Sequence, residues 1–245
     1  MINKKIRLIE LFGGIGSQAM ALHDLAVANG LNPDDVFEHY RLVEFDKYPV
    51  KSYNAIHGTN FEPIDITQIS GNDLGIIDKK NFVYILTYSF PCQDLSLAGK
   101  QAGMDKGAGT RSGLLWEVER LLNELDNLPD YLIMENVTQV HGKKNIHNFE
   151  AWIQFLESKG YYNYWQDLEA SQYGIPQHRN RTFMVSSLND INYEFPRTIP
   201  LKYVMRNLLD PKVDEKFYIN NEKADALIHK LIEEGKLDEE SVLAS

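Results

Sequence analysis

The sequence predicts an α/β fold in which helices cover both faces of a mostly parallel sheet. Short apolar runs, typical of buried strands, alternate with segments of helical periodicity along most of the chain. Polar clusters directly follow several of these runs, as in a doubly wound sheet whose strand ends carry the functional site. With 245 residues, 43% of them hydrophobic and 24% charged, the chain is long enough for one large domain or two small ones.

The N-terminal part contains three successive strand ends. Residues 6–11 are an expected strand, and a glycine-rich turn then leads into a helix over residues 19–28. This layout presents helix N-terminal amides to a ligand, but the spacing is not the dinucleotide fingerprint, so a tight turn without a ligand is an alternative. Residues 40–46 and 64–67 are the next expected strand ends. Gly14, Glu44 and Asp65 are therefore predicted to form a nucleoside pocket, and Asp46 is also a candidate helix N-cap.

The C-terminal part continues the alternation of strands and helices. Strands are expected over residues 82–86, 131–134, 161–169 and 182–185, and helices over residues 113–125 and 148–159. One strand late in the order, over residues 181–187, is expected to run antiparallel. Beyond residue 189 the prolines at positions 196 and 200 interrupt the pattern, and helices are predicted over residues 201–209 and 221–235.

Cys92 is the only cysteine, and it follows the expected strand over residues 82–86. A lone cysteine is usually a small buried hydrophobic residue, but a thiol at the exit of a central strand is also where an α/β enzyme places a nucleophile. A single cysteine excludes an internal disulfide and fits a reducing compartment. The seven histidines show no paired ligand spacing, so no metal site is predicted.

Charge and hydropathy limit the partners and the location. The net charge of −10 is unusual for a protein that grips a phosphate backbone by itself, so any basic patch is local or is supplied by another molecule. No apolar run approaches the roughly 20 residues that span a bilayer, and no secretion signal precedes the first strand. A cytoplasmic location without membrane contact is expected.

Four polar clusters at strand ends resemble, in identity and order, the motifs of the cytosine-5 DNA methyltransferase family. They are Phe12-Gly13-Gly14-Ile15-Gly16, Pro91-Cys92-Gln93, Glu135-Asn136-Val137 and Gln177-x-Arg179-x-Arg181. The resemblance covers roughly residues 5–220, including Leu95-Ser96 and Gly99-Lys100-Gln101 in the loop after the second motif. It implies the three-layer, Rossmann-like fold of S-adenosylmethionine-dependent methyltransferases. It also implies methylation of DNA, as in restriction–modification.

The resemblance assigns catalytic roles to four residues. Cys92 is the thiolate that adds to carbon 6 of cytosine, and it calls for a cationic surrounding because most of a free thiol is protonated at neutral pH. Glu135 contacts the ring nitrogen and the exocyclic amine, a role that favours a desolvated carboxyl with a raised pKa. Arg181 holds the carbonyl oxygen of the base, and Arg179 supports the site or binds a phosphate. The alternative for the arginine pair is a solvated loop with surface ion pairs.

The same resemblance implies binding roles for further residues. The methyl donor S-adenosylmethionine is expected to contact Phe12, Gly14, Ile15, Gly16, Glu44, Phe45, Asp65, Ile66, Pro91 and Leu114. The substrate base or DNA is expected to contact Gln93, Asn136 and Gln177. Because base chemistry requires a flipped nucleotide, the segment over residues 94–110 is expected to close over DNA.

The sequence departs from the family in two respects. Tyr88 stands where the family has a small residue, and its ring faces either the cofactor or the core. The expected catalytic domain spans residues 1–190, and residues 191–245 are expected to be an extension towards a target-recognition domain. The sequence contains no match to that domain or to the last two motifs of the family. Two explanations are open: a second polypeptide carries the missing parts, or the chain is a truncated module that binds DNA or cofactor. Methylation of RNA in place of DNA is a further possibility, whereas the spacing of the glycines argues against a nicotinamide oxidoreductase.

Overall fold

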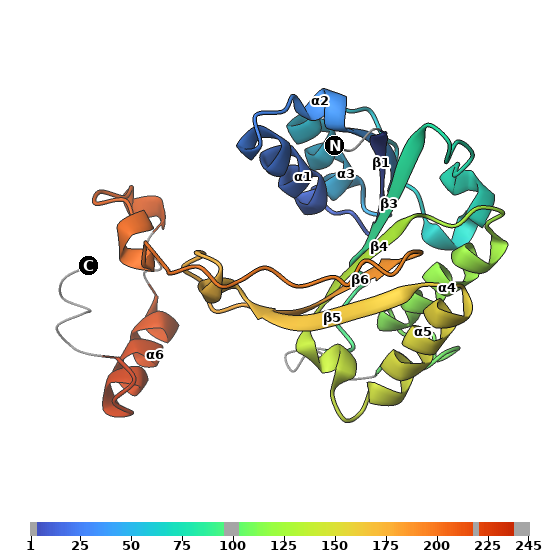
Figure 1. Ribbon diagram of the computed structural model, residues 1–245. Helices are drawn as coiled ribbons and strands as arrows, with labels where there is room; N and C mark the ends of the chain where they lie inside the picture. Colours follow the sequence, from blue (N-terminus) through green and yellow to red (C-terminus); the bar gives the residue numbers. More distant parts are fainter. Residues whose placement is uncertain (1–3, 96–102, 218–220, 238–245) are drawn as a thin grey trace. The chain divides into compact units, whose positions relative to one another are not determined.

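The computed structural model describes residues 4–95, 103–217 and 221–237. Six strands form one sheet in the order β2-β1-β3-β4-β6-β5 (Figure 1). Strand β6 runs antiparallel to both of its neighbours, and the other pairs are parallel. The predicted α/β class and the single reversed strand are thus confirmed. The strands are β1 (Lys5–Leu11), β2 (Phe37–Val43), β3 (Phe82–Tyr88), β4 (Tyr131–Asn136), β5 (Tyr162–Glu169) and β6 (Asn180–Ser187).

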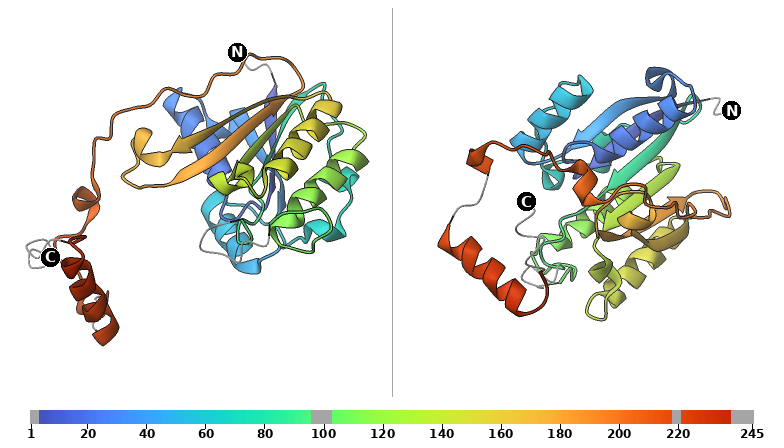
Figure 2. Two further views of the ribbon diagram at one scale, coloured as in Figure 1. Left: turned by 90° about the horizontal axis from the view of Figure 1, so that it is seen from below. Right: turned by 90° about the vertical axis from the view of Figure 1, so that its left-hand side faces the viewer.

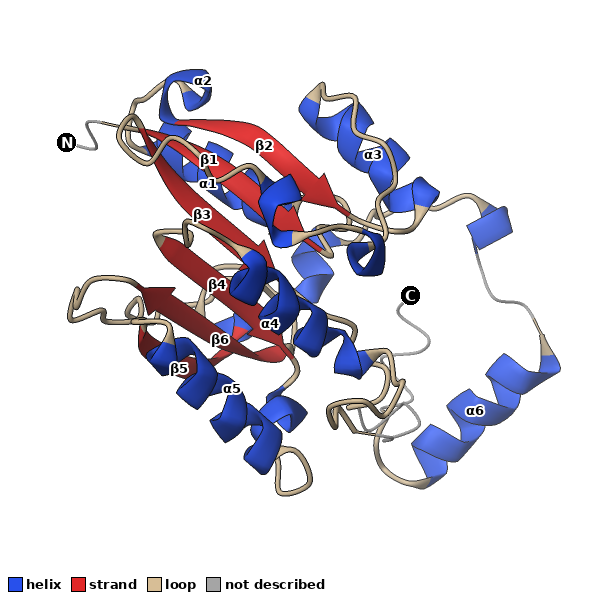
Figure 3. Ribbon diagram, turned by 90° about the vertical axis from the view of Figure 1, so that its right-hand side faces the viewer, coloured by secondary structure: helices blue, strands red, loops and turns tan. Residues whose placement is uncertain are grey.

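Helices cover both faces of the sheet, which gives three layers (Figures 2 and 3). On one face α1 packs against the even-numbered positions of β1, where Ile6 and Leu8 are buried with Ala19. On the other face α4 and α5 cover the larger cluster. The alternation of side chains along each strand therefore sends successive residues into two separate cores. The helices of this sandwich are α1 (Ser17–Ala28), α2 (Pro33–Val36), α3 (Lys47–His57), α4 (Leu115–Glu124) and α5 (Ile146–Ser158).

Tyr88 lies in the core and does not face the cofactor side. Its ring is fully buried at the end of β3 and meets the ring of Trp152 from α5 edge-on, at 5.7 Å between centroids. The Trp152 indole N–H donates to the Tyr88 hydroxyl at 3.0 Å. The large side chain at this position is accommodated because an aromatic partner satisfies its polar tip.

Two predicted elements are wrong. Residues 64–67 are not a strand: Ile64 makes one backbone bond to Glu44, and Asp65 then caps the 3₁₀ turn η1 (Ile66–Gln68). Residues 201–209 are not an α-helix and contain only the 3₁₀ turn η6 (Met205–Leu208). Every side chain of that stretch is exposed, so no packing stabilises a helix there.

The chain divides into two compact units, Met1–Leu201 and Lys202–Ser245. The second contains η6, the 3₁₀ turn η7 (Glu215–Phe217) and the amphipathic helix α6 (Glu222–Glu233). Asn221 caps α6 by accepting bonds from two backbone amides of its first turn. Among the described helices, none is long and apolar enough to cross a membrane.

The carboxyl ends of the parallel strands meet at one edge of the sheet, here called the catalytic edge. The reversed strand β6 contributes its beginning to this edge, because Thr182 pairs with Asn136 at the end of β4. The end of β5 also lies there, since Glu169 pairs with Asn180. All four polar motifs of the sequence therefore gather at one edge, although they are spread over about 170 residues of chain.

Candidate active site

Cys92 is half-buried at the catalytic edge, four residues beyond the end of β3. The segment that carries it is tied to the neighbouring strand, because the Asn136 side-chain amide donates to the Phe90 carbonyl at 2.9 Å. A tight turn follows, in which the Leu95 amide donates to the Cys92 carbonyl at 3.0 Å. Asn136 is itself buried and its side chain holds the loop that carries Cys92, whereas the sequence led us to expect a contact with the base or DNA.

Glu135 and the two arginines form an ion-pair cluster at the end of β4 and the beginning of β6. The Arg181 Nε lies 3.1 Å from Glu135 Oε1, and the Arg179 Nη2 lies 3.6 Å from the same oxygen. The antiparallel register places Glu135 opposite Phe183, so Arg181 is the next side chain on the same face. The arginines thus pair with Glu135 in the free protein.

A small cavity of about 240 Å³ opens beside this cluster. One side is polar, with Glu135, Arg179 and Arg181, and the remainder consists of apolar and aromatic groups from β5, β6 and the hairpin between them. A planar base fits such a site, because the rings and aliphatic groups contact its faces and the charged groups reach its edge. The other lining residues are Leu168, Ala170, Tyr173 and Phe183.

The glycine turn between β1 and α1 adopts a strained backbone path. Phe12 has a positive φ of 57° and donates its amide to the Val43 carbonyl at 2.7 Å. Gly14 (φ 55°) donates its amide to the Glu44 carboxylate at 3.1 Å, and a Cβ there would meet no atom within 4 Å. Gly16 (φ 82°) packs closely against α3. The turn thus favours glycine at both positions because φ is positive, and at Gly16 there is also no room for a Cβ.

The larger cavity at the catalytic edge measures about 630 Å³ and lies between the ends of β1, β2 and β3. Of the predicted cofactor contacts, Phe12, Glu44, Phe45, Asp65, Ile66, Pro91 and Leu114 line it. Gly14, Ile15 and Gly16 do not, because they form the turn behind Phe12. Gln93 lines this cavity and not the one beside Glu135, whereas Gln177 is exposed in the turn before Arg179. Sequence reasoning missed Val43, Asp46, Ile64, Thr67, Ser89 and Arg111.

Polar and apolar groups are arranged in this cavity as a nucleoside requires. The Glu44 carboxylate is fixed by the amides of Gly14 and Asp46, at 3.1 and 3.0 Å, and keeps lone pairs for ribose hydroxyls. Phe45 is exposed beside it and offers an aromatic face. The residues present therefore fit S-adenosylmethionine, whose adenosine and methionine parts need both kinds of contact.

One wall of the cavity is held from behind by Arg120 of α4. Its guanidinium donates to the carbonyls of Ile66 and Ile69, at 2.9 and 3.0 Å. Glu117 and Glu124 pair with the same guanidinium and keep it in place. A single side chain thus connects α4 to the 3₁₀ turn that lines the pocket.

A buried carboxyl lies beneath the glycine turn. The Tyr53 hydroxyl donates to Glu10 at 2.5 Å, and the Tyr53 oxygen lies 2.7 Å from His39 Nδ1. Burial raises the pKa of Glu10 to about 7, although the hydrogen bond from Tyr53 opposes this. Burial also lowers the pKa of His39 to about 4. His39 is therefore neutral near neutral pH, and Glu10 keeps its proton to a much higher pH than a free carboxyl.

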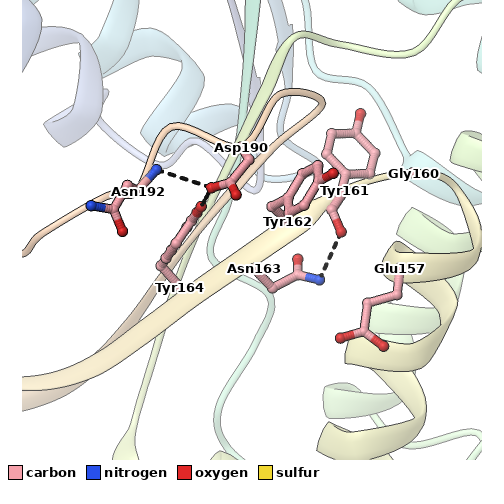
Figure 4. A pocket seen from close by; sticks show the side chains of 8 residues that line it. All are labelled: Glu157, Gly160, Tyr161, Tyr162, Asn163, Tyr164, Asp190 and Asn192. Carbon is pink, nitrogen blue, oxygen red and sulfur yellow. Dashed lines mark hydrogen bonds between the residues drawn. The ribbon is translucent and has the colours of Figure 1, made fainter.

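A separate cavity of about 660 Å³ lies at the other end of the sheet, where β5 begins (Figure 4). Its walls are tyrosines and acids, and the Tyr164 hydroxyl donates to Asp190 at 2.7 Å. It contains none of the predicted site residues. Over the described ranges, no group of three or more His, Cys, Asp or Glu side chains is arranged to hold a metal ion.

The fold and the two cavities define an S-adenosylmethionine-dependent methyltransferase domain. Two solved structures share this fold. A methyltransferase of Entamoeba histolytica superposes with a TM-score of 0.69 at 20% identity, covering 93% of this chain and 66% of that one. The Dnmt2 methyltransferase of S. pombe gives 0.63 at 21% identity, covering 89% and 64%.

The chain belongs to the C-5 cytosine-specific DNA methylase family, whose model matches residues 6–243. The match extends further than the sequence motifs led us to expect, since they indicated a resemblance up to about residue 220. Type II methyltransferase M2.ScrFI of Lactococcus lactis subsp. cremoris is 44% identical over 264 residues, covering 88% of this chain and 71% of that protein. Orphan methyltransferase M.SssI of Spiroplasma monobiae is 33% identical over 271 residues, covering 89% and 68%. Type II methyltransferase M.HhaI of Haemophilus parahaemolyticus is 30% identical over 232 residues, covering 94% and 64%. The chain spans about two thirds of the length of these proteins.

Proposed function

We propose that the chain transfers a methyl group from S-adenosylmethionine to carbon 5 of cytosine in DNA through a covalent adduct of Cys92. The observation that carries the proposal is the cluster of Glu135, Arg179 and Arg181 beside a base-sized cavity. Glu135 lies on β4, next to the strand that presents Cys92, and the two arginines lie at and just before the start of β6, the following strand in the sheet. The larger cavity borders the same loop through Pro91 and Gln93, so a methyl donor bound there reaches the same reaction centre.

Each residue then has a chemical task. The Cys92 thiolate forms a bond to carbon 6 of cytosine, and Glu135 donates a proton to the ring nitrogen that gains the electron pair. Carbon 5 becomes nucleophilic and would take the methyl group from S-adenosylmethionine, with S-adenosylhomocysteine as the leaving group. Loss of the carbon 5 proton to water restores the double bond and expels the Cys92 thiolate, and the ring nitrogen returns its proton to Glu135. Arg181 holds the carbonyl oxygen of the base, and Arg179 contributes positive charge nearby.

Glu135 must exchange partners for this chemistry. In the free protein its Oε1 forms ion pairs with two guanidinium groups, at nitrogen–oxygen distances of 3.1 and 3.6 Å. A cytosine in the cavity replaces part of that pairing with its own ring nitrogen and amino group. The ion pairs of the free protein are therefore partly given up when the base binds.

We infer that target recognition needs a second polypeptide. The chain carries a net charge of −10, whereas binding to a phosphate backbone calls for positive charge. Helix α1 and the turn after it also expose Leu25, Val27 and Leu31, each more than half accessible. A partner that covers this apolar face and brings lysines and arginines supplies both needs.

The test is covalent trapping with DNA that contains 5-fluorocytosine, in the presence of S-adenosylmethionine, with and without candidate partner polypeptides. Fluorine at carbon 5 blocks the final elimination, so an active enzyme stays attached to DNA through Cys92. Cys92→Ser abolishes the adduct, and an adduct that persists in this variant refutes the mechanism. Full activity of the chain alone contradicts the need for a partner. A matched RNA arm that is modified in preference to DNA overturns the choice of substrate.

A further inference from the structure

Ser112 is a buried serine that forms hydrogen bonds on both sides of Cys92. It opens the 3₁₀ turn η3 (Ser112–Leu114) and is 0% exposed. Its hydroxyl donates to the Pro91 carbonyl at 2.7 Å and accepts from the Asp94 amide at 3.3 Å. Its own amide donates to the Asp94 carboxylate at 3.2 Å. These bonds connect the start of the α4 region to the nucleophile loop, about 20 residues earlier in the sequence.

The three hydrogen bonds flank Cys92, whose thiol must be held in a fixed position for the proposed reaction. The Pro91 carbonyl belongs to the peptide group that directly precedes Cys92, and the Asp94 amide belongs to the second peptide group after it. The orientation of these two peptide planes sets the direction of the Cys92 Cα–Cβ bond, and with it the path of the thiol. Asn136 holds the preceding carbonyl, that of Phe90, at 2.9 Å from the β4 side.

Burial makes these bonds strong constraints. With Ser112 at 0% and Asp94 at 9% exposure, water cannot replace the hydroxyl if it is removed. The Pro91 carbonyl and the Asp94 amide then lose a partner, at a cost of about 1–3 kcal/mol for each unsatisfied buried group. The loop is expected to relieve this cost by rotating those peptide planes, which displaces the thiol.

We propose that Ser112 is a positioning residue that fixes Cys92 for addition to carbon 6 of cytosine. This inference rests on the proposed function, because it assumes that Cys92 is the nucleophile. A role in folding alone is the competing account, since Ser112 also precedes α4. The two accounts differ in which step is affected: positioning changes the rate of covalent addition, whereas a folding role changes stability and all binding steps together.

The experiment compares Ser112→Ala with the wild-type chain in the preparation in which the wild type forms the 5-fluorocytosine adduct. We expect the single-turnover rate of adduct formation to fall about 10–100-fold, as for misplacement of a reacting group by about 1 Å. The Kd for S-adenosylmethionine and the KM for DNA stay within about twofold of the wild type, because the groups that bind both substrates remain.

Ser187→Ala is the matched control, because Ser187 is equally buried, at the opposite end of β6, and also accepts a backbone amide. It is expected to keep the wild-type addition rate. Asp94→Ala provides a second variant if Ser112→Ala folds poorly: it removes one of the three bonds, and we expect a loss of about 3–10-fold in the same rate. The positioning role is overturned if Ser112→Ala forms the adduct at the wild-type rate. If Ser112→Ala fails to fold, the same conclusion follows from a wild-type rate in folded Asp94→Ala. A loss matched by weaker cofactor binding and a lower Tm also overturns it. Absence of any adduct with the wild type refutes the proposed function instead.

Discussion

Replacing Glu10 by glutamine tests whether burial beneath the glycine turn keeps this carboxyl protonated at a pH where a free carboxyl is ionised. Glu10 is 1% exposed on β1, and its Oε1 finds no hydrogen-bond partner within the described part of the chain. Burial raises its pKa from 4.5 to about 7, against the effects of the Tyr53 hydroxyl and the Ala19 amide. Glutamine has the same shape and keeps an oxygen for Tyr53, but it cannot ionise.

The sign of the effect follows from the direction of the pKa change. The unfolded chain loses the Glu10 proton near pH 4.5 and the folded chain near pH 7, so stability falls as the pH rises through this window and is constant above it. Between about pH 5 and about pH 8.5 the wild type loses about 2.5 kcal/mol through this group, since a tenfold change in proton affinity is worth about 1.4 kcal/mol. Glu10→Gln is free of that loss.

The assay is the free energy of unfolding by urea at both pH values, for the wild type, Glu10→Gln and the exposed control Glu150→Gln. The glutamine amide is left without a partner at either pH, so its cost cancels in the comparison. The advantage of Glu10→Gln over the wild type is expected to grow by about 2–3 kcal/mol from the lower to the higher pH, or about 5–10 °C in Tm. An advantage that does not change with pH, or that Glu150→Gln shares, refutes the reasoning.

Two further predictions concern Arg120, which supports the larger cavity, and the glycine turn after β1. Arg120→Lys leaves one of the two carbonyls of Ile66 and Ile69 without its donor. Titration of the protein with S-adenosylmethionine is therefore expected to show a Kd about 5–10-fold higher than that of the wild type. An unchanged Kd would show that Arg120 does not support the cofactor pocket. Gly16→Ala puts a Cβ 2.4 Å from His57 Nε2 at a φ of 82°, and denaturant unfolding is expected to show that the free energy of unfolding falls by about 2–4 kcal/mol. Gly30→Ala is the control, because Gly30 also has a positive φ, of 68°, but has open space around it; its free energy of unfolding is expected to fall by about 1 kcal/mol. Equal losses in the two glycine variants contradict the steric argument.

The fold was predictable because its elements follow simple periodicities. No residue of β1, β3 or β4 is fully exposed, so these runs are rich in apolar residues and easy to recognise. The reversed strand was predicted from the family resemblance, and the antiparallel pairing of Thr182 and Asn136 is a long-range fact that no local pattern encodes. The stretch over residues 64–67 misled the prediction because isoleucines flank its acid as in a strand, whereas Asp65 caps a turn.

The candidate site was predictable at the level of motifs but not of contacts. Residue type and order indicated Glu135 and Arg181 as members of one site, and the structure brings them within 3.1 Å. The sequence offers no signal for Arg120 or Ser112, which act across 54 and 21 positions through backbone carbonyls. Such contacts depend on how α4 returns to the sheet, and only the assembled fold determines that.

The reversal of β6 also decides where the polypeptide leaves the sheet. A parallel last strand would have ended at the catalytic edge, but β6 ends at Ser187, which pairs with Tyr131 at the opposite edge. The following residues travel back in an extended path, and Ile199 donates its amide to the Gln172 carbonyl, next to the Tyr173 that lines the base-sized cavity. The route costs about a dozen residues of chain, yet it returns the polypeptide to the hairpin that borders the arginines. The first compact unit therefore ends shortly after the chain has passed the hairpin that borders the arginines, and insertions after this point leave the sheet undisturbed.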